Sequence, residues 1–250
     1  MSVLRWAELT RERLSELLPE ALVVLPVGAI EQHGRHLATG TDALLATTAA
    51  ERAVSLAAES APRKLVLAPT LAFGASDHHL PFGGTLSLRP ETLLAILLDL
   101  ARSVAECGGR RLVLLNGHGG NRGICSAAAA AASVRNPVAV AYTDYWDAAV
   151  GADLAGVGGG DTPLPGHAGG FETSLVLAVA PELVVDRTER SAVPEIPQVT
   201  GLEIHRQASW HEQDGYTDQP AHATADRGEV WLDHLVSVLA DRLVDLTKAL

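Results

Sequence analysis

Residues 111–134 read RLVLLNGHGGNRGICSAAAAAASV, and this stretch decides the fold. The apolar run Arg111–Leu115 has the length and composition of a buried strand. It leads directly into the glycine-rich loop Asn116–Asn121, and an alanine-rich helix follows to about Val134. A strand joined to a helix by a short loop is the repeating unit of layered α/β domains.

The same alternation extends along the chain. Further strands are predicted at 21–27, 64–68 and 138–142, and further helices at 7–18, 41–58, 90–106, 170–179 and 227–250. This order predicts a largely parallel sheet flanked by helices. The Gly- and Pro-rich segment 151–166 is either a surface linker or a lid beside the site. Residues 187–220 are irregular and polar.

Length, charge and cysteine usage limit the function. A chain of 250 residues suits one large domain, taken here as 1–250. The formal charge of -11 argues against a nucleic-acid partner, which usually needs a basic face. No signal peptide or membrane-spanning segment is expected. Cys107 and Cys125 lack a CxxC partner, so we expect reduced thiols in a soluble cytoplasmic protein.

Histidines gather where predicted strands end. Five of the ten histidines follow such strands: His33, His36, His78, His79 and His118. In an open α/β sheet, ligands bind beyond the carboxyl ends of the strands. The sequence therefore predicts a functional site at that edge of the sheet.

Residues 27–42, VGAIEQHGRHLATGTD, contain the first group of candidate ligands. Glu31 and His33 are two residues apart, so an extended backbone places both on the same side. A glycine-containing turn is expected to bring Asp42 back toward Glu31 and His33. Imidazole and carboxylate ligands together suit zinc, manganese or iron. The alternative is a polar loop that caps a helix, with Asp42 in its first turn.

The loop after residue 115 adds His118 to this group. Its flanking residues Gly119 and Gly120 allow the backbone to approach an ion or substrate closely. A glycine-rich loop before a helix can instead bind phosphate, but GxGxxG and the Walker lysine are both missing. With the first segment present, the sequence predicts a metal site made of Glu31, His33, Asp42 and His118.

Residues 166–174, GHAGGFETS, form the third candidate segment. Glu172 lies in the first turn of a predicted helix, where the helix dipole favours a negative charge. It is either a metal ligand or an ordinary helix-capping acid. His167 precedes this helix and either orients a ligand or transfers a proton to an amide leaving group.

These segments together resemble the creatininase (creatinine amidohydrolase) family over almost the whole chain. The matching stretches are LPVGAIEQHGRH (25–36) with Asp42, FGASDHHLPFGGTLSL (73–88), LVLLNGHGGN (112–121), YWD (145–147), HAGGFETSLVLA (167–178) and ATADRGE (223–229). The resemblance implies a three-layer α/β/α sandwich, usually in a homo-oligomer and often in a hexamer. It also implies one or two divalent ions, Zn²⁺ or Mn²⁺ with Fe²⁺ as a further candidate.

The implied activity is hydrolysis of a cyclic or linear amide C–N bond of a small molecule by metal-activated water. By motif position, Glu31, Asp42 and His118 would hold one ion, and His33 and Asp42 the second. His167 would protonate the departing nitrogen. One alternative is a peptidase that trims a short peptide, of the type that acts on the mycofactocin precursor. A non-catalytic metal-binding homologue is another.

The chain also departs from creatininase proper. Gly119 and Gly120 stand where that enzyme has an aromatic residue and a glutamate that binds the second ion. Either Glu172 replaces this glutamate or the second site is weak. The aromatic residue expected just before His167 is missing as well, so creatinine is not the expected substrate.

Four residues are candidates for binding the substrate. His79, Trp146 and the backbone of Gly119 and Gly120 are expected to line its pocket. The alternative for His79 is a hydrogen bond that stabilises its loop. For Trp146 the alternative is a packing role.

Overall fold

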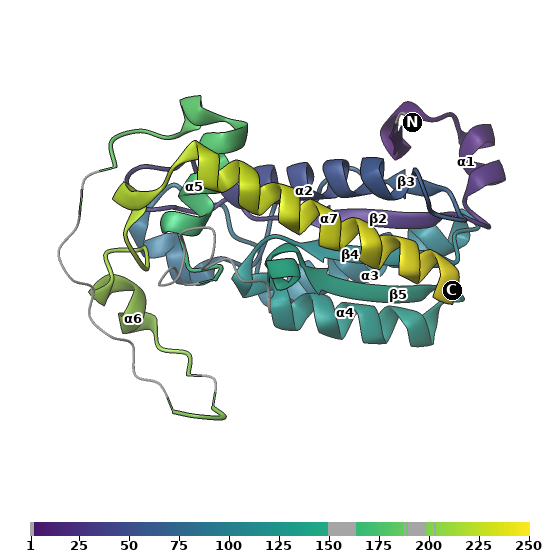
Figure 1. Cartoon of the computed structure of the whole chain (residues 1–250). Helices are drawn as coiled ribbons and strands as arrows, with labels where there is room; N and C mark the ends of the chain where they lie inside the picture. The colour runs from purple at the N-terminus through teal and green to yellow at the C-terminus, as the bar shows by residue number, and fades with distance from the viewer. Residues whose placement is uncertain (1–2, 150–163, 188, 190–198, 203) are drawn as a thin grey trace.

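The computed structural model describes residues 3–149, 164–187, 189, 199–202 and 204–250. Within these ranges, strands and helices alternate from the N-terminus to residue 144 (Figure 1). The predicted linker or lid at 151–166 lies outside the described residues except for its last three.

Five parallel strands form one sheet in the order β1-β3-β2-β4-β5. Their bounds are Leu4–Arg5 (β1), Leu22–Val27 (β2), Leu65–Leu67 (β3), Arg111–Asn116 (β4) and Ala139–Asp144 (β5). The central pair, β2 and β4, is in register from Val23 opposite Leu112 to Val27 opposite Asn116. The predicted parallel sheet is confirmed.

Helices cover both faces of this sheet. The α-helices of the described residues are α1 (Arg11–Leu17), α2 (Thr41–Ala57), α3 (Pro90–Glu106), α4 (Arg122–Arg135), α5 (Gly170–Val179), α6 (Gln207–Glu212) and α7 (Ala225–Ala249). Figure 1 shows α2 and α7 on one face and α3 and α4 on the other. The predicted three-layer α/β/α architecture is therefore confirmed.

The two hydrophobic cores follow from the alternation of side chains along the strands. Leu22 and Val24 of β2 face the core that α2, α5 and α7 cover. Val23 and Leu25 face the opposite core beneath α3 and α4. Because both faces are covered, the central strands are apolar without interruption, as is typical of buried parallel sheets.

Two elements differ from the sequence prediction. β1 was not predicted, because two half-buried residues carry no readable periodicity. Helix α6 lies in the segment 187–220 that we expected to be irregular. Among the described residues, no helix combines the length and apolarity needed to cross a membrane.

The packing of α7 on α5 depends on Gly228. A Cβ atom at Gly228 would lie 1.9 Å from the Ser174 carbonyl oxygen, so the two helices could not keep their present distance. We expect Gly228→Ala to lower the free energy of unfolding by about 1–3 kcal/mol, measured by urea denaturation.

Gly123→Ala in α4 is the matched control, because no atom lies within 4 Å of its added Cβ. It should change stability by less than about 1 kcal/mol. Equal effects at both glycines would contradict this account of the α5–α7 contact.

Candidate metal centre

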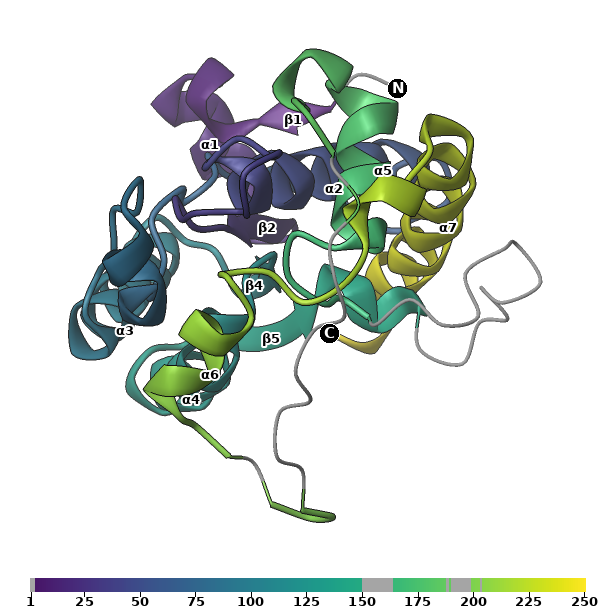
Figure 2. The same ribbon diagram turned by 90° about the vertical axis from the view of Figure 1, so that its left-hand side faces the viewer.

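The predicted site residues come together at the carboxyl edge of the sheet. The loops that follow β2, β3 and β4 meet there with the N-terminus of α5 and with α6 (Figure 2). They enclose a cavity of about 720 Å³, and the cavity is lined by Glu31, Asp42, His79, His118, His167 and Glu172, among other residues. Trp146, Gly119 and Gly120 also contribute to its lining.

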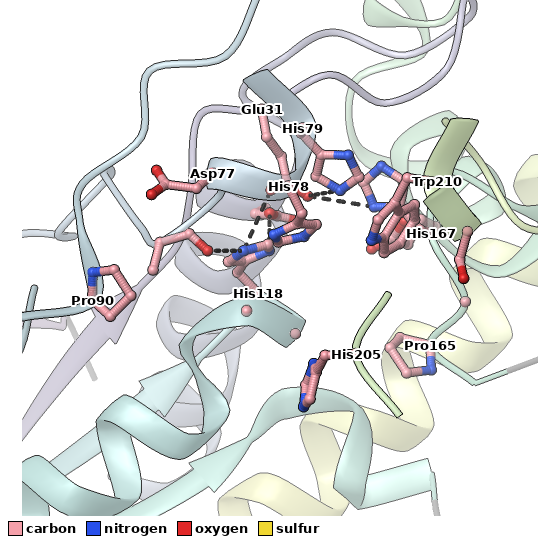
Figure 3. Close-up of a pocket in the computed structure, with 18 of the residues that line it drawn as sticks. Glu31, Asp77, His78, His79, Pro90, His118, Pro165, His167, His205 and Trp210 are labelled. Atoms are coloured by element: carbon pink, nitrogen blue, oxygen red, sulfur yellow. Dashed lines mark hydrogen bonds and ion pairs between the residues drawn. The ribbon is translucent and has the colours of Figure 1, made fainter. Parts of the chain in front are cut away.

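Glu31 lies at the centre of this cluster (Figure 3). Its side chain is fully buried, and three imidazoles surround its carboxylate. The distances are 3.3 Å from Oε2 to His118 Nε2 and 3.4 Å from Oε1 to both His79 Nε2 and His167 Nδ1. Burial alone would raise the pKa of Glu31, but the charge of His118 holds this pKa well below its usual range.

Asp42 lies in the first turn of α2 and faces two other imidazole nitrogens. Its Oδ1 is 3.1 Å from His33 Nε2, and its Oδ2 is 3.1 Å from His118 Nδ1. Burial opposes protonation of His33, but the Asp42 carboxylate prevails and raises the pKa of His33 to about 10. In the same way Glu31 raises the pKa of His118 above its ordinary value despite burial. In the metal-free protein, protons on these imidazoles balance the buried carboxylates.

The orientation of His33 suits a metal ligand. Its Nδ1 lies 3.1 Å from the backbone oxygen of Glu31, which can only accept a hydrogen bond. The Nδ1–H therefore donates to this oxygen and leaves Nε2 directed at Asp42. Metal-binding histidines are commonly oriented by a hydrogen bond of this kind on the second ring nitrogen.

Glu172 completes this part of the cluster. Its Oε2 accepts a hydrogen bond of 2.6 Å from the Ala168 backbone N–H and lies 3.8 Å from His33 Nε2. Burial raises the pKa of Glu172 to about 8, so a nearby cation would be needed to keep it ionised at neutral pH. One ligand atom each from His33, Asp42 and Glu172 lie within 4.8 Å of one another. The structure thus brings Glu172 to His33 and Asp42, the residues that the family resemblance assigned to the second ion.

His118 is held in place by the side chain of Asn116 at the end of β4. Asn116 Oδ1 accepts from the backbone N–H of His118, and Asn116 Nδ2 donates to the backbone oxygen of His118. The same Nδ2 group donates to Asp144, and Asp144 also accepts from the Tyr142 hydroxyl. This buried network fixes the loop that carries His118.

His118 meets the two carboxylates through opposite ring nitrogens. Nδ1 faces Asp42 and Nε2 faces Glu31. Nε2 also lies 3.1 Å from the backbone oxygen of Ala75. The structure therefore brings Glu31, Asp42 and His118 into contact, with the imidazole between the two carboxylates.

Gln32, which the sequence analysis did not single out, orients two more imidazoles. Its Nε2 lies 2.6 Å from the Gly215 backbone oxygen, 2.7 Å from His79 Nδ1 and 3.1 Å from His167 Nε2. Since His167 Nε2 donates to the Gln32 backbone oxygen, the two amide hydrogens go to Gly215 and His79. His79 Nδ1 is then the acceptor, and its Nε2–H points toward Glu31. Burial lowers the pKa of His79 to about 3, in agreement with a neutral ring.

His167 presents a free nitrogen to the cluster. Its Nε2 lies 2.9 Å from the backbone oxygen of Gln32 and donates to it, which leaves Nδ1 unprotonated and facing Glu31. Burial and the charge of His33 hold the pKa of His167 well below its ordinary value. The ring is therefore available to accept a proton inside the cavity or to act as a ligand.

Two aromatic residues border this cavity. Trp146 is 3% exposed and packs against Tyr145, so it combines a packing role with a place in the cavity wall. Trp210 of α6 was not predicted. Its ring lies 4.4 Å from the ring of His79 and 5.3 Å from that of His167, measured between centroids.

The donor set fits a divalent ion. No hydrogen bond among the described residues reaches Glu31 Oε1, Glu31 Oε2 or Asp42 Oδ2, although all three atoms are buried. Unpaired buried carboxylate oxygens are costly unless a cation compensates them. Carboxylates combined with imidazoles are the ligands that zinc and similar ions prefer in proteins.

Comparison with known proteins agrees with this picture. The family model for creatininase, creatinine amidohydrolase, matches residues 7–243. The creatinine amidohydrolase of Pseudomonas putida is 31% identical over 245 residues, which cover 90% of this chain and 89% of that protein. A solved structure named "Creatininase Mn" has a TM-score of 0.82 at 27% identity, covering 96% of this chain and 97% of that one.

A second type of relative is a peptidase. The mycofactocin precursor peptide peptidase of Mycobacterium tuberculosis is 40% identical over 172 residues. The matched region covers 67% of this chain and 61% of the peptidase, so it spans less than two thirds of that protein.

The role of Asn116 in holding the His118 loop can be tested by removing the Asn116 side chain. Asn116→Ala removes four buried hydrogen bonds of the loop, and we expect it to lower the free energy of unfolding of the metal-free protein by about 1–3 kcal/mol. Urea denaturation measures this change. The control Asn136→Ala removes one part-buried bond to Ala132 and should cost about 1 kcal/mol or less. A larger loss in the control variant would argue against a special role for Asn116.

Proposed function

Because the chain belongs to the creatininase family, we propose that it is a metal-dependent amidohydrolase that cleaves an amide C–N bond of a small molecule. The family is one of hydrolases that act on carbon–nitrogen bonds. The observation that carries the proposal is the pair of buried carboxylates, Glu31 and Asp42, whose oxygens face imidazole nitrogens while three of them lack a hydrogen bond among the described residues.

By motif position we assign Glu31, Asp42 and His118 to one ion position, and from their grouping in the structure we assign His33, Asp42 and Glu172 to a second. The close grouping of His33, Asp42 and Glu172 supports Glu172 as the carboxylate that replaces the residue missing at Gly120. Zn²⁺ or Mn²⁺ suits this mixture of oxygen and nitrogen ligands, and Fe²⁺ is a further candidate. When bound, such an ion lowers the pKa of water toward about 7 and polarises a carbonyl group.

The protein side chains then have separate tasks. His167 accepts a proton at Nδ1 and delivers it to the departing nitrogen, while its Nε2–H remains bonded to the Gln32 carbonyl oxygen. Backbone N–H groups of Gly119 and Gly120 are the candidate donors to the developing oxyanion. His79 and Trp146 shape the pocket around the substrate. The presence of His167 favours an enzyme over a non-catalytic metal-binding homologue.

A peptidase that trims a short peptide is the second candidate. Within the 172 matched residues, the identity to the M. tuberculosis peptidase is 40%, against 31% over 245 residues for the P. putida creatinine amidohydrolase. This higher identity favours a peptidase. The cavity of about 720 Å³ has room for several residues of a peptide. In both cases we propose one domain over residues 1–250 in a cytoplasmic homo-oligomer, with a hexamer as the form that the family resemblance favours.

The metal assignment predicts how two histidine variants differ. His118→Ala should lower the affinity for zinc and the turnover by more than about 100-fold, because losing even a residue outside the ligand set commonly costs 10–100-fold. Metal content per chain and the hydrolysis rate measure the two effects. His167→Ala is the matched variant: it should keep its metal and lose about 10²–10⁴-fold in rate. Normal metal content and turnover in His118→Ala would refute the assignment.

The two candidate activities predict different substrates. The metal-loaded protein should hydrolyse cyclic amides or N-formyl compounds if it is a small-molecule amidohydrolase. It should release short fragments from peptides if it is a peptidase. Product analysis by mass spectrometry on a panel of the three compound types decides between them, with His118→Ala as the inactive control. Turnover of none of these classes would contradict the proposed hydrolase.

A further inference from the structure

Gly120, two residues after His118, has no side chain and so cannot supply a side-chain ligand. A Cβ atom at Gly120 would lie 2.4 Å from the Ala75 oxygen and 2.5 Å from His118 Nε2. It would also lie 3.1 Å from Cε1 of His78. The space beside Gly120 and His118 is therefore occupied by the imidazole of His78, which belongs to the loop after β3.

The imidazole of His78 lies beside the ligand atoms of the cluster. Its ring is nearly parallel to that of His118, with an interplanar angle of 6° and centroids 5.8 Å apart. One ligand atom each from Glu31, His78 and His118 lie within 4.8 Å of one another. Figure 3 shows the rings of His78 and His118 next to each other below Glu31.

The loop that carries His78 is held rigidly against the His118 loop. The Ala75 backbone N–H donates to Asn121 Oδ1, and Asn121 is part of the loop that carries His118. One residue further on, the Ser76 backbone N–H donates to Ser87 Oγ. These bonds fix the backbone that precedes His78 against the loop that carries His118.

No hydrogen bond among the described residues explains the orientation of the His78 ring. Among the residues that the structure describes, no hydrogen bond engages either of its ring nitrogens. Trp210 covers its outer side, with ring centroids 5.3 Å apart. The two oxygens of Glu31 are buried and have no hydrogen-bond partner within the described chain, so they are available as ligands at the same place.

We infer that His78 is a ligand of the ion that Glu31 and His118 bind. The inference rests on the proposed function, since it requires that the cluster holds a divalent ion. Adding an imidazole nitrogen to a position whose other proposed ligands include two carboxylates makes that position more favourable for zinc relative to manganese, which prefers oxygen ligands. His78 therefore gives this position a preference for Zn²⁺.

Metal binding without turnover tests this inference. The 250-residue chain is stripped of metal, and Zn²⁺ and Mn²⁺ are titrated against a chromophoric chelator. His78→Ala and His78→Gln should each weaken zinc at one position by about 10-fold or more and weaken manganese less. His78→Gln keeps the bulk of the side chain, and circular dichroism of the metal-free proteins verifies that both variants fold.

His211→Ala is the control, because His211 is exposed on α6 and contacts the ring of Phe82 outside the cluster. Its zinc affinity should stay within about twofold of the original. Unchanged zinc affinity in a folded His78→Gln variant would overturn the role of His78.

The His118→Ala variant separates this failure from failure of the proposed function. If His118→Ala loses zinc while His78→Gln keeps it, the metal centre stands and only the ligand role of His78 falls. If neither variant changes zinc affinity, both proposals fall.

Discussion

The burial of two carboxylates with too few hydrogen-bond donors is the constraint on which the rest of this structure depends. Glu31 is fully buried and Asp42 nearly so, yet three of their four oxygens lack a hydrogen bond among the described residues. In the metal-free form, protons on His33 and His118 supply the compensating positive charge. A divalent ion can take over that role and release these protons, as metal binding to histidine sites generally does.

The fold supplies the rigidity that this arrangement needs. Parallel strands deliver the loops to one edge of the sheet, and the side chains of Asn116 and Asn121 tie those loops together. Asn121 bonds to the Gly28 and Ala75 backbones, so it links the loops that carry Glu31, His78 and His118. On the other side, α7 supports α5 and keeps Glu172 near His33. Several hydrogen-bonded contacts thus maintain a group of charges that would otherwise repel or become solvated.

The sequence predicted the layers and the central cluster because both follow from local patterns. Apolar runs separated by amphipathic helices indicate a parallel sheet, and ligands directly after strands must meet at its edge. Gln32 and Trp210 escaped notice because their roles arise from tertiary contacts: Gln32 spans from His79 to Gly215, and Trp210 comes from a short helix in an irregular segment. The proposed role of His78 depends on its tertiary contact with Gly120 and His118, which no local sequence pattern predicts.

Anomalous diffraction from crystals of the zinc-loaded protein tests the central claim most directly. The account predicts a zinc peak at about 2.0–2.2 Å from carboxylate oxygens of both Glu31 and Asp42, at ordinary zinc–oxygen distances. The opposite result is a cluster without any anomalous peak, in which water or side-chain donors satisfy the oxygens of Glu31 and Asp42. That outcome would mean that the buried carboxylates are balanced by protons alone, and the metal centre would have to be abandoned.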